Sequence, residues 1–575
     1  MIDRNFFMAL IAAFAMVIAY NYYYEMRFGD YLRTEQANQM AEVQKEQDKA
    51  IEKPPVTAVE TKDVTTQHEA GLAPASTPLA VSPPLEAVET HPADGEKRIT
   101  IDTGVTKVVL TNKGAVPLNY LLEGYQNGDA GEIDLIFNLP QYIQARKAQD
   151  EKVAALEKIK PYPTLGFRFS NDKFSNKVNG SLFSASTKDE TVVMHEGDEP
   201  FTIVYELEDT SGIVIRKKFT FHYGDYSFDF SALVKSTEKW GAFDYSLVWF
   251  GLGEELDAKK MAYNSYHGPV MMVNGERLSG APEDDEPEIN YKGVIKWGAV
   301  ANRYYTAAAI PQNPSGMEVV SRYIDDTHSA LEWKFKAKLS NEPESFVLFV
   351  GPKKHSALEN YTNGMYSIID YGWLDFFAKP LFWVLNFFHG LFGNWGWAII
   401  ALTACIKVLF FPLSQKSFKS MKRMQVIQPQ MKKLQETYKN DKEQLNREML
   451  KMYREHKVNP LGGCLPMVLQ IPVFFALYKV LLESIELKGA GFILWITDLA
   501  VKDPYYVTPV LMGASMLAQM MMTPSTGDKA QRYVMLAMPI VFTFMFLSFP
   551  AGLVIYWLVN NLLTIGQQWI IYREK

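Results

Sequence analysis

One lysine lies within an apolar stretch that is long enough to cross a membrane. Lys407 is the only charged residue between positions 395 and 411, and Pro412 follows that segment. A charge at the centre of a membrane helix costs about 2.5–3.5 kcal/mol on insertion scales, so such residues are rare and usually functional. Thr403 lies four residues earlier and therefore on the same face of a helix. This pair predicts a hydrated cavity within the bilayer.

The alternative is a lysine whose ammonium extends along its own helix to the cytoplasmic headgroups. We expect Pro412 to end the helix, which places Lys407 roughly 8 Å from that end at 1.5 Å per residue. That distance is within reach of a long side chain, so this segment alone leaves both interpretations open.

Further polar residues lie in the other apolar segments. Four of them are spaced by four, four and three residues, so they share one face of a helix over residues 552–571: Tyr556, Asn560, Thr564 and Gln567. Gln470 lies in the middle of another apolar segment. Such groups face a bundle interior or a cavity, although hydrogen bonds between helices, worth about 0.6 kcal/mol each, are an alternative. Together with Lys407 and Thr403, they favour a hydrophilic groove.

Methionines gather in the segment over residues 505–522. We predict that three of them, at helical spacing, contact apolar parts of a substrate: Met512, Met516 and Met520. Flexible thioethers suit a surface that accepts many apolar partners. Ordinary packing against lipid is the alternative.

Bond-making chemistry has no recognisable motif in the sequence. There is no phosphate-binding loop, nucleophile elbow or paired C-x-x-C, and none of the nine histidines has ligand spacing with another. The only cysteines are Cys405 and Cys464, so residues 31–360 cannot form a disulfide framework. The net charge of −7 gives no overall attraction to nucleic acid. We expect no catalytic residue, no metal site and no cofactor.

The N-terminal part of the chain predicts an anchor and a linker. Residues 5–24 are apolar or aromatic enough for a transmembrane helix, and they end in a tyrosine run typical of a membrane interface. A cleaved signal peptide is the alternative. Residues 31–97 are rich in Pro, Ala and Glu and cannot bury enough apolar surface to fold, which predicts a tether.

Residues 98–355 predict a large β-sandwich. Residues 201–207 and 213–221 are strand-like and flank a turn that ends at Gly212. Several other short segments alternate apolar and polar residues, with little helical periodicity. No pair of carboxylates in this region has a setting that indicates glycoside chemistry.

The remainder predicts a helical membrane core over residues 395–573. An amphipathic helix over 371–392 should lie in the membrane interface. Five transmembrane helices are then expected at 395–413, 463–483, 505–522, 533–549 and 552–571. With the N-terminal anchor, the fold class is a multi-domain membrane protein with six transmembrane helices, a periplasmic β-sandwich domain and a cytoplasmic helical hairpin.

The basic loop at residues 414–460 sets the orientation. It holds twelve Lys and Arg but five Asp and Glu, so the positive-inside rule places it in the cytoplasm, with both termini. Apolar residues at spacings of three and four predict a helical hairpin with a turn near Asn440. Six of its cations are candidates for docking to an anionic surface, either a ribosome or lipid headgroups: Lys416, Lys419, Lys422, Arg423, Lys432 and Lys433. A solvated hairpin whose charge only sets topology is the alternative.

Several motifs occur in an order and spacing that resemble one family. They are Asp370-Tyr-Gly-Trp373, Gly393-Asn-Trp-Gly396, Lys457-Val-Asn-Pro-Leu-Gly-Gly-Cys464, Gln470-Ile-Pro472, Asp503-Pro-Tyr-Tyr506 and Phe549-Pro-Ala-Gly-Leu-Val-Ile-Tyr556. The sequence therefore resembles the YidC/Oxa/Alb membrane protein insertases of the bacterial inner membrane, in the form with a large periplasmic domain.

The resemblance implies an insertase and chaperone for nascent membrane proteins, which works alone or with the Sec translocon. It implies a groove open to the cytoplasm and to lipid, with Lys407 as its positive residue and Thr403 and Tyr556 facing substrates. Most relatives carry arginine where this chain has Lys407, so the charge is kept but the bidentate guanidinium is lost. The long basic C-terminal tail of some relatives has no counterpart here, so ribosome contact is expected through the 414–460 hairpin. A secondary transporter, the rival class, would predict repeated halves, and the sequence has no internal repeat.

Overall fold

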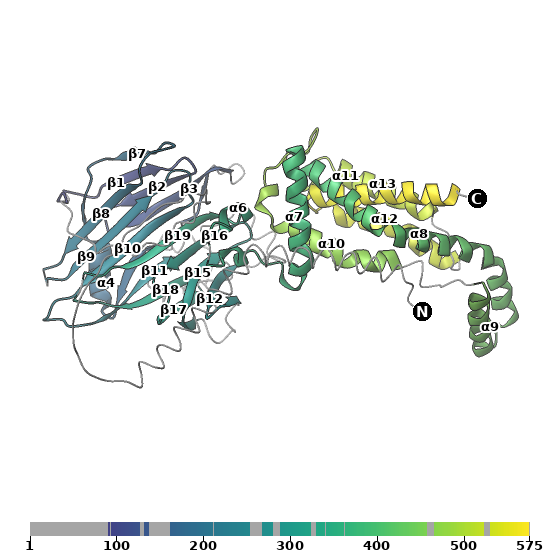
Figure 1. Ribbon diagram of the computed structural model, residues 1–575, viewed down its shortest axis with the longest axis horizontal. Coiled ribbons are helices and arrows are strands. Elements are labelled where there is room, and N and C mark those ends of the chain that lie inside the picture. Colours follow the sequence, from purple (N-terminus) through teal and green to yellow (C-terminus); the bar gives the residue numbers. More distant parts are fainter. Residues whose placement is uncertain are drawn as a thin grey trace, which may run out of the picture. The chain divides into compact units, whose positions relative to one another are not determined.

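The structure is a computed structural model that describes residues 90–126, 132–136, 162–252, 267–279, 288–323, 329–361, 363–456, 465–522 and 529–573, except for positions 93, 211 and 340. The chain forms two compact units, one within Ala75–Asp370 and the other including Tyr371–Lys575 (Figure 1). The predicted anchor and nearly all of the predicted linker lie outside the described residues.

The first unit is built on a nine-stranded antiparallel sheet. Its strand order is β13-β12-β15-β16-β19-β10-β9-β8-β6. In chain order the strands are β6 (Ser184–Ala185), β8 (Phe201–Glu208), β9 (Val214–Phe221), β10 (Ser227–Lys235), β12 (Gly268–Val273), β13 (Glu276–Ser279), β15 (Ile295–Ala301), β16 (Tyr305–Pro311) and β19 (Glu344–Pro352). The predicted hairpin is confirmed, because β8 pairs with β9 along its whole length.

Two five-stranded sheets complete this unit. One has the order β4 (Glu132–Asp134), β3 (Val116–Gln126), β2 (Thr106–Thr111), β1 (Arg98–Asp102) and β7 (Thr191–Val193), in which β1 and β7 are parallel. The other has the order β14 (Glu288–Gly293), β17 (Met317–Tyr323), β18 (Ser329–Lys336), β11 (Asp244–Phe250) and β5 (Gly166–Phe169). Helix α4 (Asp172–Gly180) lies between β5 and β6, and the short helices α6 (His355–Leu358) and η2 (Met365–Ile368) follow β19.

Both smaller sheets pack on the same face of the large one. Tyr120 of β3 stacks on Phe228 of β10, and Trp333 of β18 packs edge-on against Phe346 of β19. Phe346 lies opposite Phe230, which points to the same face as Phe228 because strand residues alternate. The unit is therefore a two-layer β-sandwich, with one wide sheet against two narrow ones.

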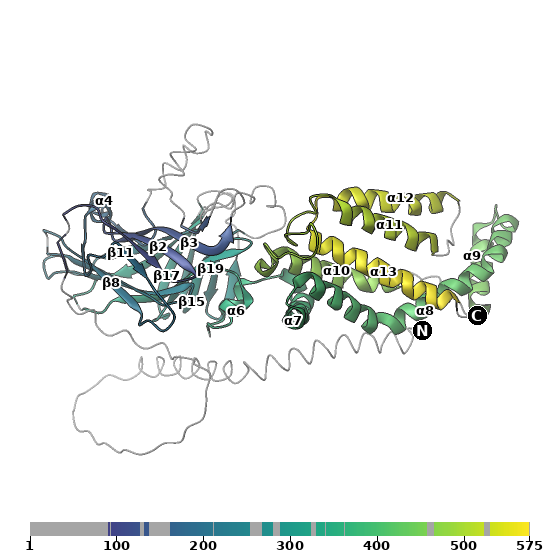
Figure 2. The same ribbon diagram turned by 90° about the horizontal axis from the view of Figure 1, so that it is seen from above.

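The second unit is helical (Figure 2). Its elements are η3 (Gly372–Leu374), α7 (Asp375–Phe392), α8 (Trp395–Thr437), α9 (Lys442–Glu455), α10 (Leu465–Glu483), η5 (Ile485–Leu487), α11 (Val507–Met522), α12 (Lys529–Phe546) and α13 (Ala551–Arg573). Helix α7 exposes an apolar face that includes Trp383, Phe387 and Leu391. Such a face is typical of a helix at a membrane interface.

Helix α8 is longer than the sequence predicted. The expectation that it ends at Pro412 is wrong, because the helix continues through Pro412 and Pro429 to Thr437. A proline removes one backbone hydrogen bond and kinks a helix, but neighbouring groups in a bundle compensate for the loss. The residues after Pro412 are mainly good helix formers, so the helix resumes at once.

Hydropathy distinguishes α8 from the other helices of the described residues. By length and composition, α8 is the one that qualifies as a membrane span, with a mean hydropathy of 2.0 over its best 18 residues. Helix α11 and the Leu536–Phe546 part of α12 are apolar but shorter. Helices α10 to α13 occupy the four other spans predicted after residue 395, and their crossing of a membrane stays a prediction.

The C-terminal part of α8 and helix α9 form an antiparallel hairpin. Its small core is Met424, Ile427, Met431 and Met452. The hydroxyl of Tyr453 lies 4.0 Å from the sulfur of Met431, and His456 bonds to Gln430 at 3.1 Å. The carboxylate of Asp441 caps α9, which confirms the predicted turn.

Candidate functional site

The start of α8 fixes the position of Lys407. The side-chain oxygen of Asn394 accepts hydrogen bonds from the backbone N–H groups of Gly396 (2.9 Å) and Trp397 (3.2 Å). Gly396 lies against Phe492 so closely that a Cβ would be 2.0 Å from a ring carbon. This cap and contact fix the helix start, so Lys407 lies twelve residues, or about 18 Å, along α8.

Helix α13 starts beside α8 and runs in the same direction. The backbone N–H of Gly552 donates to the carbonyl of Leu499, and a Cβ on Gly552 would lie 3.3 Å from the side chain of Ile399 near the start of α8. Thr564 lies thirteen residues after the first residue of α13, or about 20 Å. Parallel helices with aligned starts therefore bring Thr564 and Lys407 to the same level.

A cavity of about 290 Å³ lies at this level of the helical unit. Its walls come from α8, α10, α11 and α13, and they combine aromatic and aliphatic side chains with amides and hydroxyls. Lys407 is the one charged residue among the lining residues of the described chain, which include no Asp or Glu. The cavity is therefore a polar space in apolar walls with a single uncompensated cation.

Hydrogen bonds connect the helices across this cavity. The ammonium of Lys407 donates to the hydroxyl of Thr564 at 2.8 Å. The amide of Gln470 donates to Asn560 at 2.6 Å and lies 3.4 Å from the Tyr556 hydroxyl. A further amide–carbonyl contact of 3.4 Å joins α13 to α8, from Gln567 to the backbone of Phe411.

Most of the predicted groove residues come together in the structure. Those that line the cavity are Lys407, Gln470, Tyr556, Asn560, Thr564, Gln567, Met516 and Met520. Polarity within an apolar segment identified Lys407 and Gln470, and helical spacing identified the residues of α11 and α13.

Two predicted residues do not line the cavity. Thr403 is 1% exposed, and its hydroxyl donates to the carbonyl of Ile399 in its own helix at 2.6 Å. Met512 is fully buried one turn away from Met516, where α11 packs on α13 and Asn561 bonds to Ser515. Helix packing covers both side chains, so neither lines the cavity in this conformation, and their contact with substrates stays a prediction.

Sequence reasoning missed other lining residues. On α11, the sequence could have identified Gln519 as a lining residue, because it is the polar residue among the methionines. Ser414 and Phe418 were missed because α8 was expected to end at Pro412. The aromatic walls of Phe474 and Trp557, which contact each other edge-on at 4.7 Å, have no distinctive spacing in the sequence.

The six predicted docking cations all lie on α8, after Pro412. Lys419, Arg423, Lys432 and Lys433 are exposed, and Lys416 and Lys422 are half-buried. They belong to the same helix as Lys407 but not to its cavity.

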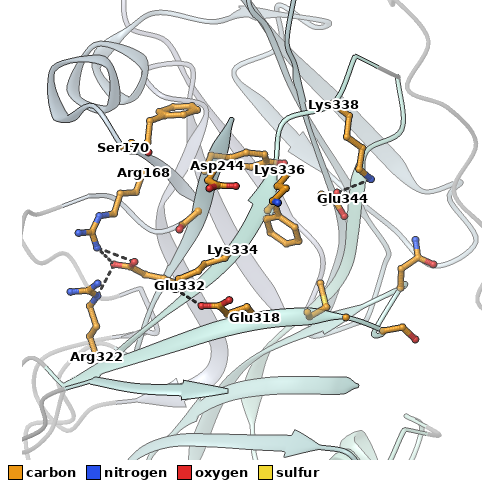
Figure 3. Close-up of a pocket in the computed structure, with 18 residues that line it drawn as sticks. Arg168, Ser170, Asp244, Glu318, Arg322, Glu332, Lys334, Lys336, Lys338 and Glu344 are labelled. Carbon is orange, nitrogen blue, oxygen red and sulfur yellow. Dashed lines mark hydrogen bonds and ion pairs between the residues drawn. The ribbon is translucent and has the colours of Figure 1, made fainter. Parts of the chain in front are cut away.

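A larger cavity of about 800 Å³ lies in the β unit, on the sheet that contains β11, β17 and β18 (Figure 3). Figure 3 shows Glu332 between Arg168 and Arg322. The carboxylate oxygen Oε1 of Glu332 lies 2.6 Å from Nη1 of Arg168 and 3.0 Å from Nε of Arg322. Lys334 pairs with Glu318 and holds the pKa of that carboxyl below its usual value. These carboxylates are already paired with cations, which leaves them poorly suited to proton transfer.

No group of three or more His, Cys, Asp or Glu side chains that could hold a metal ion occurs within the described ranges. Among the described residues, the cavity around Lys407 is the candidate site, because it combines a cation with polar side chains from several helices.

Comparisons with known proteins agree for both units of the chain. Residues 98–384 match the YidC periplasmic domain family, and residues 387–575 match the 60Kd inner membrane protein family. The membrane protein insertase YidC of Syntrophus aciditrophicus is 36% identical over 499 residues, which cover 85% of this chain and 88% of that protein. The YidC of Geotalea daltonii is 35% identical over 513 residues, which cover 87% and 91%.

Two solved structures are also similar. An active YidC insertase crystal structure with the first transmembrane domain resolved is 17% identical, with a TM-score of 0.36, and the match covers 86% of this chain and 96% of that one. A putative aldose 1-epimerase from Escherichia coli K12 is 11% identical, with a TM-score of 0.25, over 44% of this chain and 99% of that one. Both TM-scores are below 0.5, so family membership follows from the sequence matches. By those matches, the chain belongs to the YidC family of membrane protein insertases.

Proposed function

We propose that the chain inserts nascent membrane proteins, and assists their folding, through the cavity around Lys407. In this proposal the cavity is a hydrophilic groove that opens to the cytoplasm and to lipid, and the chain works alone or with the Sec translocon. The supporting observation is the ammonium of Lys407, which faces a cavity whose described lining contains no carboxylate. An uncompensated charge in such a setting is costly, so it indicates a functional role.

The mechanism lowers an insertion barrier and makes no covalent bond, so we do not class the chain as an enzyme. A polar tail that crosses the bilayer must leave water, and a hydrated groove shortens the apolar part of that path. The Lys407 ammonium attracts acidic tails for a short time, more strongly than it would in bulk water. Release into lipid is driven by burial of the client's own apolar segment.

Charge variants of Lys407 test this function. The clients are single-span proteins with acidic or neutral N-terminal tails, and insertion is measured by protease protection in cells that carry each variant. Lys407→Arg should retain activity because the charge remains. Lys407→Ala should impair clients with acidic tails most, since they lose the attraction, whereas neutral tails still use the shortened path.

A lysine that merely extends to the headgroups would give mild effects that do not depend on the client. Normal insertion of acidic-tailed clients by Lys407→Ala would exclude the charged-groove mechanism.

For topology, we propose that the N-terminus, the 414–460 segment and the C-terminus are cytoplasmic and that the β unit is periplasmic. The basic residues of that segment support this orientation. The test is labelling of a cysteine placed at Ser420, in a chain whose two natural cysteines have been replaced. Labelling from the periplasmic side would contradict the orientation. Within the same proposal, α7 lies in the outer interface through its exposed face of Trp383, Phe387 and Leu391.

The hairpin of α8 and α9 is proposed to dock on an anionic surface, a ribosome or lipid headgroups. Lys432 and Lys433 are exposed near its tip. Lys432→Glu should reduce co-sedimentation with the surface that the hairpin binds, either ribosomes or anionic vesicles. Arg447→Glu is a matched control, because that guanidinium already pairs with Glu443 at 2.7 Å. Equal losses from both changes would indicate a general charge effect.

A further inference from the structure

The cation in the cavity is held by a neutral acceptor. Lys407 donates to the Thr564 hydroxyl at 2.8 Å, and this is its one hydrogen-bond partner in the described part of the chain. The hydroxyl of Thr564 donates in turn to the backbone carbonyl of Asn560 at 2.6 Å. A hydroxyl has one hydrogen and two acceptor lone pairs, so this second bond orients a lone pair toward the ammonium.

The other residues on this polar face of α13, Tyr556, Asn560 and Gln567, contact different partners. Asn560 accepts a hydrogen bond from Gln470 through its side chain, and the Tyr556 hydroxyl lies next to the same amide. Gln567 donates to the backbone of Phe411. Thr564 is therefore the residue on this face of α13 that accepts a hydrogen bond from Lys407.

A neutral acceptor has a consequence that a carboxylate would not have. A lysine stem is long and flexible, and without a partner its ammonium tends to move toward water and headgroups. A carboxylate would hold the ammonium but cancel its charge. The Thr564 hydroxyl holds it and leaves the charge in place, with the remaining N–H groups available to a ligand.

We propose that Thr564 is a positioning residue that keeps the Lys407 ammonium in the cavity and thereby sets the preference for clients with acidic tails. The proposal rests on the proposed function of Lys407 as the groove cation. It assigns to Thr564 a role that acts through another residue, since Thr564 itself need not touch the client.

The first test replaces the hydroxyl by a methyl group of similar shape. Thr564→Val should reduce insertion of an acidic-tailed client about fivefold, because a hydrogen bond to a charged group is lost and the ammonium relocates. Insertion of the matched neutral-tailed client should stay within about 1.5-fold of wild type, because the shortened path does not need the charge. Thr564→Ser, which keeps the acceptor, should restore the acidic client. An equal loss for both clients would overturn the proposal in favour of a purely structural role.

The second test places Thr564→Val in a Lys407→Ala chain. With no ammonium to position, the valine should cause no further loss for the acidic-tailed client. Two residues that act as one unit give such a non-additive result. A further loss in this background would contradict the proposal, since Thr564 would then act independently of Lys407.

The two hypotheses fail in distinguishable ways. If Lys407→Ala inserts acidic tails normally, the proposed function fails whatever Thr564 does. If Lys407→Ala is impaired and Thr564→Val is not, the groove cation stands and the positioning role is wrong. Accumulation of each variant is compared with wild type, and Thr564→Ala, which removes the hydroxyl without adding a methyl group, replaces the valine variant if that one accumulates poorly.

Discussion

Two lysines lie among apolar side chains, one in each unit, and their ammonium groups are satisfied differently. Lys217 of β9 is 0% exposed and donates to three backbone carbonyls, those of Gly114 (2.8 Å), Ala115 (3.2 Å) and Leu165 (2.7 Å). Lys407 is half-buried and donates to a single hydroxyl. An ammonium has three N–H groups, so the first is saturated by its own chain and the second is not.

The contrast separates a structural cation from one that is available to a ligand. The carbonyls around Lys217 belong to segments with left-handed backbone, at Gly114 (φ 73°), Ala115 (φ 50°) and Leu165 (φ 58°). Such conformations are costly outside glycine and persist only where surrounding contacts impose them. Lys217 therefore links two strained segments to β9, which lies between β8 and β10. The ammonium of Lys407 bonds instead to a side-chain hydroxyl and faces a cavity.

Removing the structural cation should have the largest effect on stability. Lys217→Met keeps the length of the side chain but leaves three buried carbonyls without their donor, and we expect a loss of about 3 kcal/mol from the free energy of unfolding of the β unit. Hydrogen exchange of the β8, β9 and β10 amides in the full chain measures this loss, as a rise of roughly 100-fold in the slowest rates.

Lys218→Met is the matched control. The neighbouring side chain points to the other face of β9 and is only half-buried, so its replacement should change the same exchange rates little. Equal protection in both variants would mean that the three carbonyls do not depend on Lys217.

The same lysine should give the β unit a pH dependence. Burial lowers the pKa of Lys217 well below its ordinary value of 10.5. Between the lowered pKa and 10.5, the unfolded chain binds a proton that the folded chain does not bind, so stability rises with pH in that window. Wild type should gain relative to Lys217→Met by up to about 1.4 kcal/mol per pH unit there.

The difference between the two chains is the measured quantity, because burial raises the pKa of tyrosines such as Tyr205 and Tyr245 and so adds the same pH dependence to both. Unfolding of each chain is compared at pH 8 and pH 10. A difference that does not change with pH would show that the pKa of Lys217 is not lowered by folding.

Removing the groove cation should change stability far less. Lys407→Met breaks one hydrogen bond, and side-chain hydrogen bonds inside membrane proteins contribute about 0.6 kcal/mol on average. The same change relieves the desolvation of a charge, which offsets part or all of that loss. Thermal unfolding of the detergent-solubilised chain should therefore differ little from wild type. A destabilisation as large as that of Lys217→Met would remove the distinction between the two lysines.

Local sequence patterns predicted individual helix faces and strands well. The spacing of four, four and three residues on α13 identified the polar face that lines the cavity, and alternation identified β8 and β9 with their turn. The same alternation contained an unused signal, because Lys217 is in register with the buried Ile215 and Phe219. That signal is weak, since a run of basic residues usually marks a solvated strand face.

Contacts between distant segments could not be predicted in this way. The bond between Lys407 and Thr564 joins residues 157 positions apart and depends on the aligned starts of α8 and α13. Helical spacing placed Thr403 beside Lys407 and Met512 beside Met516, but packing of neighbouring helices decides which turn reaches the cavity. The pairing of β5 with β11, far along the chain, likewise has no signature in either strand.

The smallest effect should be that of the β unit on insertion. The residues proposed to act on clients all lie after position 395, and the carboxylates of the β cavity named above are paired with cations. Two variants test this: Lys217→Met, and a chain that lacks most of residues 98–340 but keeps the N-terminal segment. Both should insert the acidic-tailed client within about twofold of wild type, because the groove still shortens the apolar part of the path. Protease protection of that client measures this, at matched levels of each chain. Complete loss of insertion at a normal protein level would assign the β unit a direct part in the mechanism and end the division of roles between the two lysines.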